Sequence, residues 1–197
     1  MDTEQARELL IEAGRRLWLR GLVAASDGNL SCRLPDGRFL ITRSGVSKGY
    51  LSAGDLLLVD GSGRVVAGTG RPSIETGLHL AVYRARPEAQ ALVHAHPPLA
   101  TAYALTGQDL NREAPDEVRL QLGRVALADY GEAGSAELAA NAAAAAATGA
   151  NAVLLRRHGA LTLGNGPEQA LFRMEALEQA AKMMLAARLL RLTPPEA

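Results

Sequence analysis

The segment ALVHAHPPLATAYALTG, residues 91–107, carries two of the chain's four histidines at the end of an apolar run. Side chains alternate between the two faces of a strand, so His94 and His96 are expected to point to the same face. Two imidazoles held side by side can bind a metal ion. The same spacing also fits two unrelated histidines that are satisfied by hydrogen bonds, so further ligands have to decide between the two interpretations.

A third histidine follows another apolar run. His158 ends AVLLRRH and precedes Gly159, which lets the backbone turn closely. A catalytic zinc site uses three protein ligands and keeps one position open. Because Cys32, the only cysteine, lies far upstream in the sequence, we expect histidine or carboxylate ligands. We predict that His94, His96 and His158 bind one zinc ion. In the alternative, His158 is a surface histidine that follows two arginines.

Other folds that use a His-x-His pair fit this chain poorly. A hydrolase of the metallo-β-lactamase type needs an Asp-His after the pair, where Pro97 and Pro98 stand, and a cupin needs a glutamate well before Glu113. An amidohydrolase barrel needs about 250 residues, whereas this chain has 197.

The elements that must position the histidines follow from hydrophobic spacing and turn residues. Asp2 with Gln5, or Thr3 alone, can cap a first helix that ends at Gly21. Further helices are expected at 72–87, 97–106, 136–148 and 167–191, and strands at 38–42, 56–60, 65–68, 91–96, 123–129 and twice within 152–164. The stretch 111–123 carries three acidic residues, whose ordinary interpretation is a solvated acidic loop. Hairpins among these elements predict a mixed or largely antiparallel sheet that is covered by helices, in a single α/β domain over residues 1–197.

The composition is that of an ordinary globular protein, with 48% hydrophobic and 21% charged residues and a formal net charge of zero. Nucleic acid is not expected as a partner, because binding to phosphate backbones needs a basic excess. One cysteine excludes an intrachain disulfide and favours a reducing, cytoplasmic compartment. We expect no membrane span, and the zero net charge favours association with further copies.

Five ordered motifs extend over nearly the whole chain: GNLS, ITRSG, RPSIETGLH, VHAHP and RRHGALTLG. Together they resemble the class II aldolase/adducin superfamily, whose members include sugar-phosphate aldolases, 4-epimerases and dehydratases. The resemblance implies a three-layer α/β/α domain with a central, mostly antiparallel sheet, and a homotetramer. It also implies that the three histidines bind zinc and that Glu75 is the acidic residue that ligates resting zinc and moves protons in turnover.

Glu75 and His79 also have interpretations from the residues alone. Glu75 stands near the start of an expected helix, where a negative charge is favoured, and this could be its whole role. His79 follows four residues later on the same helical face. It could orient the carboxylate, or it could be a buried structural histidine.

Three segments could bind a phosphate group. Gly28 and Asn29 form a turn that can present backbone N–H groups, and Ser44, Gly45 and Ser73 can add hydroxyl and N–H donors. The resemblance implies that these segments form the phosphate cradle. Ile74 departs from the aldolase pattern, which often has a second serine at this position. Without the resemblance, these residues are interpreted as ordinary turns.

The sequence predicts a metal-dependent enzyme with an incomplete set of proton donors. The stretch NREAPDEVRLQLG has no tyrosine where the resembling aldolases use one, which leaves Glu113, Asp116 and Glu117 as candidates. Glu117 is favoured among the three, and a solvated acidic loop is the better interpretation of each residue taken singly. We predict a zinc-dependent lyase that cleaves a phosphorylated ketose by retro-aldol chemistry. The alternatives are a methylthioribulose-1-phosphate dehydratase-like enzyme, a sugar-phosphate 4-epimerase and a non-catalytic adducin-like interaction module.

Overall fold

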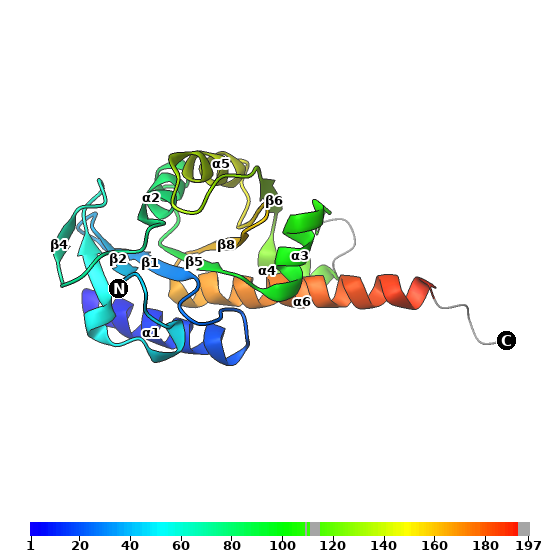
Figure 1. Cartoon of the computed structure of the whole chain (residues 1–197), viewed down its shortest axis with the longest axis horizontal. Helices are drawn as coiled ribbons and strands as arrows, with labels where there is room; N and C mark the ends of the chain where they lie inside the picture. The colour runs from blue at the N-terminus through cyan, green and yellow to red at the C-terminus, as the bar shows by residue number, and fades with distance from the viewer. Residues whose placement is uncertain (109, 111–114, 193–197) are drawn as a thin grey trace.

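The computed structural model describes residues 1–108, 110 and 115–192, with the side chain of residue 192 left out. Its centre is an eight-stranded sheet in the order β4-β3-β2-β1-β5-β8-β7-β6 (Figure 1). The strands are β1 (Asn29–Arg33), β2 (Phe39–Thr42), β3 (Leu56–Val59), β4 (Val65–Ala67), β5 (Ala91–Ala95), β6 (Val125–Ala128), β7 (Ala152–Leu155) and β8 (Gly159–Gly164). All neighbouring strands are antiparallel except β6 and β7. The predicted mostly antiparallel sheet is therefore confirmed.

Helices cover both faces of this sheet and give three layers (Figure 1). Among the described residues the α-helices are α1 (Thr3–Leu19), α2 (Thr76–Ala85), α3 (Pro98–Thr106), α4 (Asp116–Leu122), α5 (Ala136–Ala147) and α6 (Pro167–Leu192). Two short 3₁₀ turns, Lys48–Tyr50 and Ala53–Asp55, precede β3. Helices α2 and α5 pack side by side on one face, and α1, α3, α4 and α6 lie on the other. The three-layer α/β/α expectation is confirmed.

Local signals fixed several helix ends as expected. Asp2 and Gln5 form the capping box of α1, Ser135 caps α5 through the N–H of Leu138, and Gly107 ends α3 in the left-handed conformation. The helix expected from residue 72 begins only at Thr76, because Pro72 forms an isolated bridge with Arg43.

The segment expected as an acidic loop contains a helix. Asp116 and Glu117 occupy the first turn of α4, after Pro115, where negative charge is favourable. Leu122 is buried, and α4 packs against α6. This tertiary contact is what an isolated seven-residue helix would lack.

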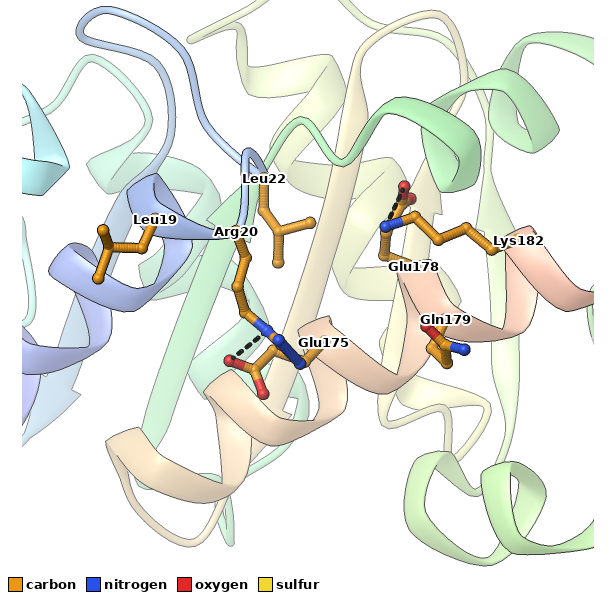
Figure 2. Close-up of a pocket in the computed structure, with 7 residues that line it drawn as sticks. All are labelled: Leu19, Arg20, Leu22, Glu175, Glu178, Gln179 and Lys182. Carbon is orange, nitrogen blue, oxygen red and sulfur yellow. Dashed lines mark ion pairs between the residues drawn. The ribbon is translucent and has the colours of Figure 1, made fainter.

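Helix α6 anchors the helix that follows His96. Helix α3 starts at a proline and has no side-chain cap of its own, but both N–H groups of Leu99 and Ala100 donate to the carboxylate of Glu178, at 3.1 and 3.0 Å. Glu178 is almost fully buried and ion-pairs with Lys182 across one turn of α6, beside a small polar pocket between α1 and α6 (Figure 2). The chain after β5 is thereby held against α6.

The C-terminal half of α6 extends beyond the sheet (Figure 1). Met183, Leu185 and Leu189 are partly exposed on this part of the helix. None of the helices in the described ranges combines the length and apolar character that crossing a bilayer requires.

Candidate active site

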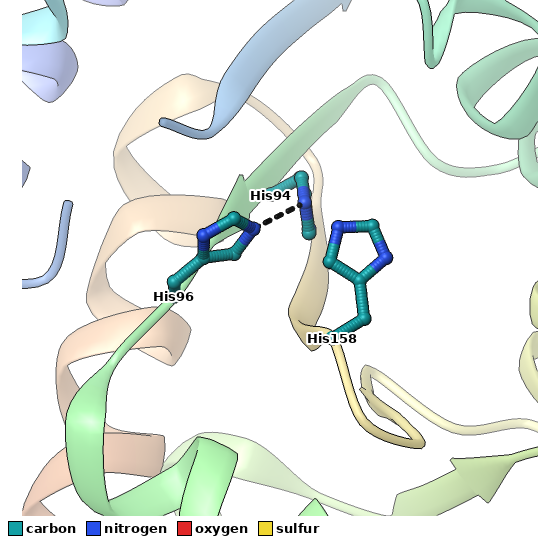
Figure 3. A group of neighbouring side chains, drawn as sticks. All are labelled: His94, His96 and His158. Atoms are coloured by element: carbon teal, nitrogen blue, oxygen red, sulfur yellow. Dashed lines mark hydrogen bonds between the residues drawn. The ribbon is translucent and has the colours of Figure 1, made fainter. Parts of the chain in front are cut away.

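The three predicted metal ligands converge where β5 ends and β8 begins (Figure 3). His94 lies on β5, His96 follows the strand's last residue, and His158 directly precedes β8. The antiparallel pairing of Ala95 with Ala160 brings these chain segments together. The strand was expected to extend to residue 96, but β5 ends at Ala95. His96 therefore lies outside the strand, and strand alternation does not set the direction of its side chain.

The backbone around His158 is specialised for this approach. Arg157 has a φ of 59°, in the left-handed region that a residue with a side chain seldom adopts. A Cβ on Gly159 would lie 2.5 Å from His96 Cδ2 and 2.6 Å from the carbonyl oxygen of Ala95. Position 159 therefore accepts only glycine if both strands and His96 keep their places.

One ring nitrogen of His94 and one of His96 face partners outside the cluster. His94 is fully buried and donates from Nδ1 to the carbonyl oxygen of Ala160 at 2.9 Å, which leaves Nε2 with its lone pair. His96 places Nδ1 3.4 Å from an Asp27 carboxylate oxygen, and its Nε2 lies 3.2 Å from that of His94. Two nitrogen lone pairs that face each other at this distance repel unless a proton or a cation lies between them.

Glu75 completes the cluster. Its Oε2 is 3.2 Å from Nε2 of His94 and its Oε1 is 3.4 Å from Nε2 of His158. Within the described part of the chain, the buried Oε1 has no hydrogen-bond donor. A tetrahedron with metal–ligand bonds of about 2.05 Å has edges of about 3.3 Å, which matches these separations. The three ligand nitrogens all lie within 4.8 Å of one another. The residues therefore fit a tetrahedrally coordinated divalent cation such as zinc.

The charges of the cluster are set by burial and by mutual contact. Burial opposes the ionisation of Glu75, but His94 and the amide of Asn29 outweigh it and hold the pKa of Glu75 well below its usual range. Burial and the neighbouring His94 lower the pKa of His158 to about 4, and the same two causes lower the pKa of His96. Burial lowers the pKa of His94, but the Glu75 carboxylate outweighs it, and the net effect is a rise. The anionic Glu75 and the neutral His96 and His158 are in the forms that bind metal, and His94 would release its Nε2 proton when a cation binds.

Glu75 is the N-cap residue of α2, but its side chain caps no backbone group. It accepts instead from Nδ2 of Asn29, at 2.7 Å. The alternative in which Glu75 only stabilises a helix start therefore lacks the contact that it requires.

All five predicted phosphate-binding residues line one pocket of about 280 Å³ beside the cluster. Its walls come from the loop before β1, the turn after β2, the segment before α2 and the loop before α5. The lining consists of Ser26, Asp27, Gly28, Asn29, Arg43, Ser44, Gly45, Lys48, Ser73, Ile74, Glu75, Ala133, His96 and His158. The cradle thus shares one cavity with Glu75, His96 and His158, whereas the fully buried His94 does not line it.

Several of the donors expected in the cradle are already used. The backbone N–H groups of Ser44 and Ser73 donate to the carbonyls of Arg71 and Thr42, at 2.9 and 3.1 Å. The amide of Asn29 is occupied by Glu75 and His79. The hydroxyls of Ser44 and Ser73 can still donate, so a phosphate would meet side chains more than the backbone.

The sequence reasoning missed two charged residues of this pocket. Asp27 faces His96, and its position directly before the predicted Gly28 turn was the available signal. Lys48 is almost fully buried, and its ammonium donates to the carbonyl oxygens of Ser26 and Val46, which ties together two walls of the pocket. Burial lowers the pKa of Lys48 to about 8. Nothing in the sequence around Lys48 distinguishes it from a surface lysine.

The favoured second proton donor is not in this pocket. Glu117 lies exposed on α4 and is absent from the lining residues of its own chain. Asp116, on the same turn, ion-pairs with Arg119. Glu113 lies outside the described residues. The role of Glu117 stays a prediction.

The side chain of His79 is fully buried and is linked to the Glu75 carboxylate through Asn29. His79 is therefore both a buried residue and a hydrogen-bond partner of the residue that holds Glu75, so both interpretations of His79 are compatible with its contacts.

Comparison with known proteins agrees with this arrangement. A curated relative, 3-oxo-tetronate 4-phosphate decarboxylase of Haemophilus influenzae, is 36% identical over 90% of this chain and 85% of its own length. Methylthioribulose-1-phosphate dehydratase of Methylococcus capsulatus is 46% identical over 66% of this chain and 57% of its own. The crystal structure of L-fuculose-1-phosphate aldolase from Thermus thermophilus superimposes with a TM-score of 0.85 at 33% identity, over 98% of this chain and all of that one.

The family model for the class II aldolase and adducin N-terminal domain matches residues 8–185. This range contains every ligand of the histidine cluster and every residue of the pocket beside it. The fold, the site and the comparisons agree, and this chain belongs to the class II aldolase family.

Proposed function

We propose that this chain is a zinc-dependent lyase that cleaves a carbon–carbon bond of a phosphorylated ketose by retro-aldol chemistry. The observation that carries the proposal is the convergence of Glu75 and three histidine Nε2 atoms, at spacings that fit one tetrahedral cation, beside a pocket whose lining includes serine hydroxyls and the basic residues Arg43 and Lys48. A bound zinc ion would supply Lewis acidity, which stabilises the negative charge that develops on the ketose carbonyl oxygen.

Two residues carry out the proton transfers of the cleavage. In a retro-aldol cleavage the bond between the α-carbon and the hydroxyl-bearing β-carbon breaks. The β-hydroxyl loses its proton and becomes an aldehyde, and the α-carbon gains a proton. Glu75 faces the cavity as an anion and carries the proton of the α-carbon. Glu117 of a neighbouring copy takes the hydroxyl proton, because in its own chain it does not line the pocket.

The phosphate of the substrate binds at the opposite wall of the pocket. The hydroxyls of Ser44 and Ser73 donate to it, Gly28 and Gly45 let it approach the backbone, and the buried Lys48 supplies positive charge below the two loops. Binding energy from this group, which takes no part in bond cleavage, orients the reacting carbons beside the cluster.

A second candidate is decarboxylation of a phosphorylated 3-oxo acid, favoured by the 36% identity to 3-oxo-tetronate 4-phosphate decarboxylase over most of the chain. Loss of carbon dioxide leaves the same kind of charge on a carbonyl oxygen as loss of an aldehyde does. Dehydration is the third possibility within the same chemistry, and a 4-epimerase needs a further acid–base pair. All of these reactions use one site, and they differ in the bond that breaks.

A product screen separates these reactions. Purified zinc-loaded protein is incubated with phosphorylated ketoses and phosphorylated 3-oxo acids, and the products are identified by mass. An aldehyde plus a shorter phosphorylated ketose supports the proposal. Release of carbon dioxide or water with an unbroken remaining skeleton would replace it with the corresponding alternative. Unchanged substrates throughout would favour a non-catalytic interaction module.

The assembly and location are proposals of the same kind. The partly exposed apolar side chains of the projecting end of α6 favour a homo-oligomer, and we propose a cytoplasmic tetramer with sites between subunits.

A further inference from the structure

A buried chain of hydrogen bonds runs from the cluster into the layer between the sheet and α2. Glu75 Oε2 accepts from Asn29 Nδ2 at 2.7 Å, and Asn29 Oδ1 lies 2.5 Å from His79 Nε2. His79 Nδ1 lies 2.6 Å from Ser31 Oγ, and Ser31 Oγ lies 2.9 Å from the hydroxyl of Tyr83. All five residues are buried, with exposed fractions of 5% or less.

The direction of each hydrogen bond follows from the first. An ionised carboxylate only accepts, so the NH₂ group of Asn29 faces Glu75 and its carbonyl oxygen faces His79. That oxygen also only accepts, so His79 carries its proton on Nε2. Nδ1 of His79 then accepts from the hydroxyl of Ser31. Burial lowers the pKa of His79 to about 3, which keeps the ring neutral and allows one nitrogen to donate while the other accepts.

His79 therefore decides which end of the Asn29 amide faces the carboxylate. If the amide rotated by half a turn, its NH₂ group would meet the Nε2–H of His79 and its oxygen would meet the negative charge of Glu75. Both contacts would be repulsive and buried. With the amide fixed, Oε2 of Glu75 is held and the unpartnered Oε1 is left to face the metal ligands.

We propose that His79 is a positioning residue, which fixes the amide of Asn29 and through it the orientation of the Glu75 carboxylate toward the cluster. Its side chain is fully buried and does not line the pocket. The catalytic part of this inference rests on the proposed function, whereas the hydrogen-bond assignment does not.

The first test reads the tautomer of His79 in metal-free protein. Long-range ¹H–¹⁵N spectra distinguish protonated from unprotonated ring nitrogens, and a chain with four histidines can be assigned by comparison with His79→Gln. We expect one ring with its proton on Nε2 that does not titrate between pH 5 and 8. A proton on Nδ1, or a ring that becomes charged in this range, would overturn the inference whether or not the proposed reaction occurs.

The second test separates positioning from packing. His79→Phe keeps a buried ring and removes the donor to Asn29, whereas His79→Gln can return a donor near the position of Nε2. We expect His79→Phe to weaken zinc binding, measured against a competing chelator, by about 10- to 100-fold, as for other residues that orient metal ligands. His79→Gln should recover most of this loss. Equal zinc affinity in wild type and His79→Phe would contradict the proposal.

A matched control accounts for the loss of any buried polar group. Thr162 is fully buried and donates to the carbonyl oxygen of Ala170 at 2.7 Å, outside the pocket. Thr162→Val should reduce the melting temperature without changing zinc affinity. If His79→Phe fails to fold, Asn29→Ala removes the amide that links His79 to Glu75. In that case, wild-type zinc affinity in Asn29→Ala would overturn the inference.

With an active substrate identified, kcat and KM provide a further readout. His79→Phe should lower kcat by about 10-fold or more and leave KM within about 2-fold, because the phosphate wall is untouched. An increase in KM alone would assign His79 to the packing of the pocket and overturn the positioning role.

Discussion

Replacing Glu75 with glutamine tests the centre of the proposed mechanism. The substitution keeps the size of the side chain and removes its charge. Asn29 Nδ2 needs an acceptor at 2.7 Å, so the new amide is expected to place its oxygen there. Its NH₂ group then occupies the position of Oε1, which in the wild type faces Nε2 of His158 at 3.4 Å. The variant would thus present a donor where the cluster needs an anionic oxygen.

The expected size of the effect follows from the lost proton carrier. General acid–base catalysis typically contributes about 10²–10⁴-fold, which corresponds to about 2.7–5.4 kcal/mol of transition-state stabilisation. We expect kcat to fall within this range. Zinc should be retained at stoichiometric protein concentrations, because His94, His96 and His158 all remain.

The assay measures kcat by product formation and zinc by elemental analysis of the same sample. Glu75→Asp is the matched control, since it keeps the negative charge and shortens the side chain by one carbon, and it should retain more activity than Glu75→Gln. If Glu75→Gln turned over within about 3-fold of the wild type while fully loaded with zinc, Glu75 would be a structural charge and the proton-transfer step would be wrong.

Further predictions address the ligands, the pocket, the pH response and the assembly. His94→Ala should lose the bound zinc that wild type retains after gel filtration; equal metal content would refute the site. Gly45→Asn should raise KM for the phosphorylated substrate by 10-fold or more with unchanged zinc, because nothing lies within 4 Å of an added Cβ and asparagine tolerates the left-handed backbone there, where φ is 75°; zinc loss in this variant would contradict the assignment. In the metal-free protein, the pKa values of His79, about 3, and His158, about 4, lie below the unfolded value of about 6.5. The unfolded chain therefore binds more protons, and stability should fall by about 2 kcal/mol from pH 7 to pH 5.5 in urea titrations, with the raised pKa of His94 acting in the opposite direction; a constant midpoint would contradict it. Light scattering should give a homo-oligomer, and a stable monomer at assay concentration would refute the interface.

The metal ligands could be predicted from sequence because their signal is local. His94 and His96 lie two residues apart at a strand end, and His158 stands next to a glycine. Bringing them together needs only the pairing of β5 with β8, two apolar segments that read as strands. Glu75 depended on the family resemblance, because a carboxylate before a helix has an equally good local explanation in helix capping.

The rest of the site depends on contacts between distant residues, which the sequence pattern does not carry. Asn29 lies 46 positions from Glu75 and 50 from His79, and no periodicity relates them. Helix α4 was missed for the same reason, because its seven residues gain their stability by packing on α6. Lys48 is charged and buried, and such a residue is recognised only when its carbonyl partners are seen.

Gly28 connects the predicted phosphate loop with the metal centre. It has a φ of 73°, and a Cβ there would lie 2.6 Å from the carbonyl oxygen of His94. The next residue, Asn29, is the register partner of His94 in the β1–β5 pair. A shift of one residue in this register would turn Asn29 to the opposite face of the sheet, away from Glu75 and His79. A side chain at position 28 is therefore expected to disturb the metal site as well as the anion pocket. An asparagine at position 45, with open space around its Cβ, is expected to disturb the pocket alone. The loop that the sequence marks as a phosphate turn also aligns the strands that hold the metal ligands.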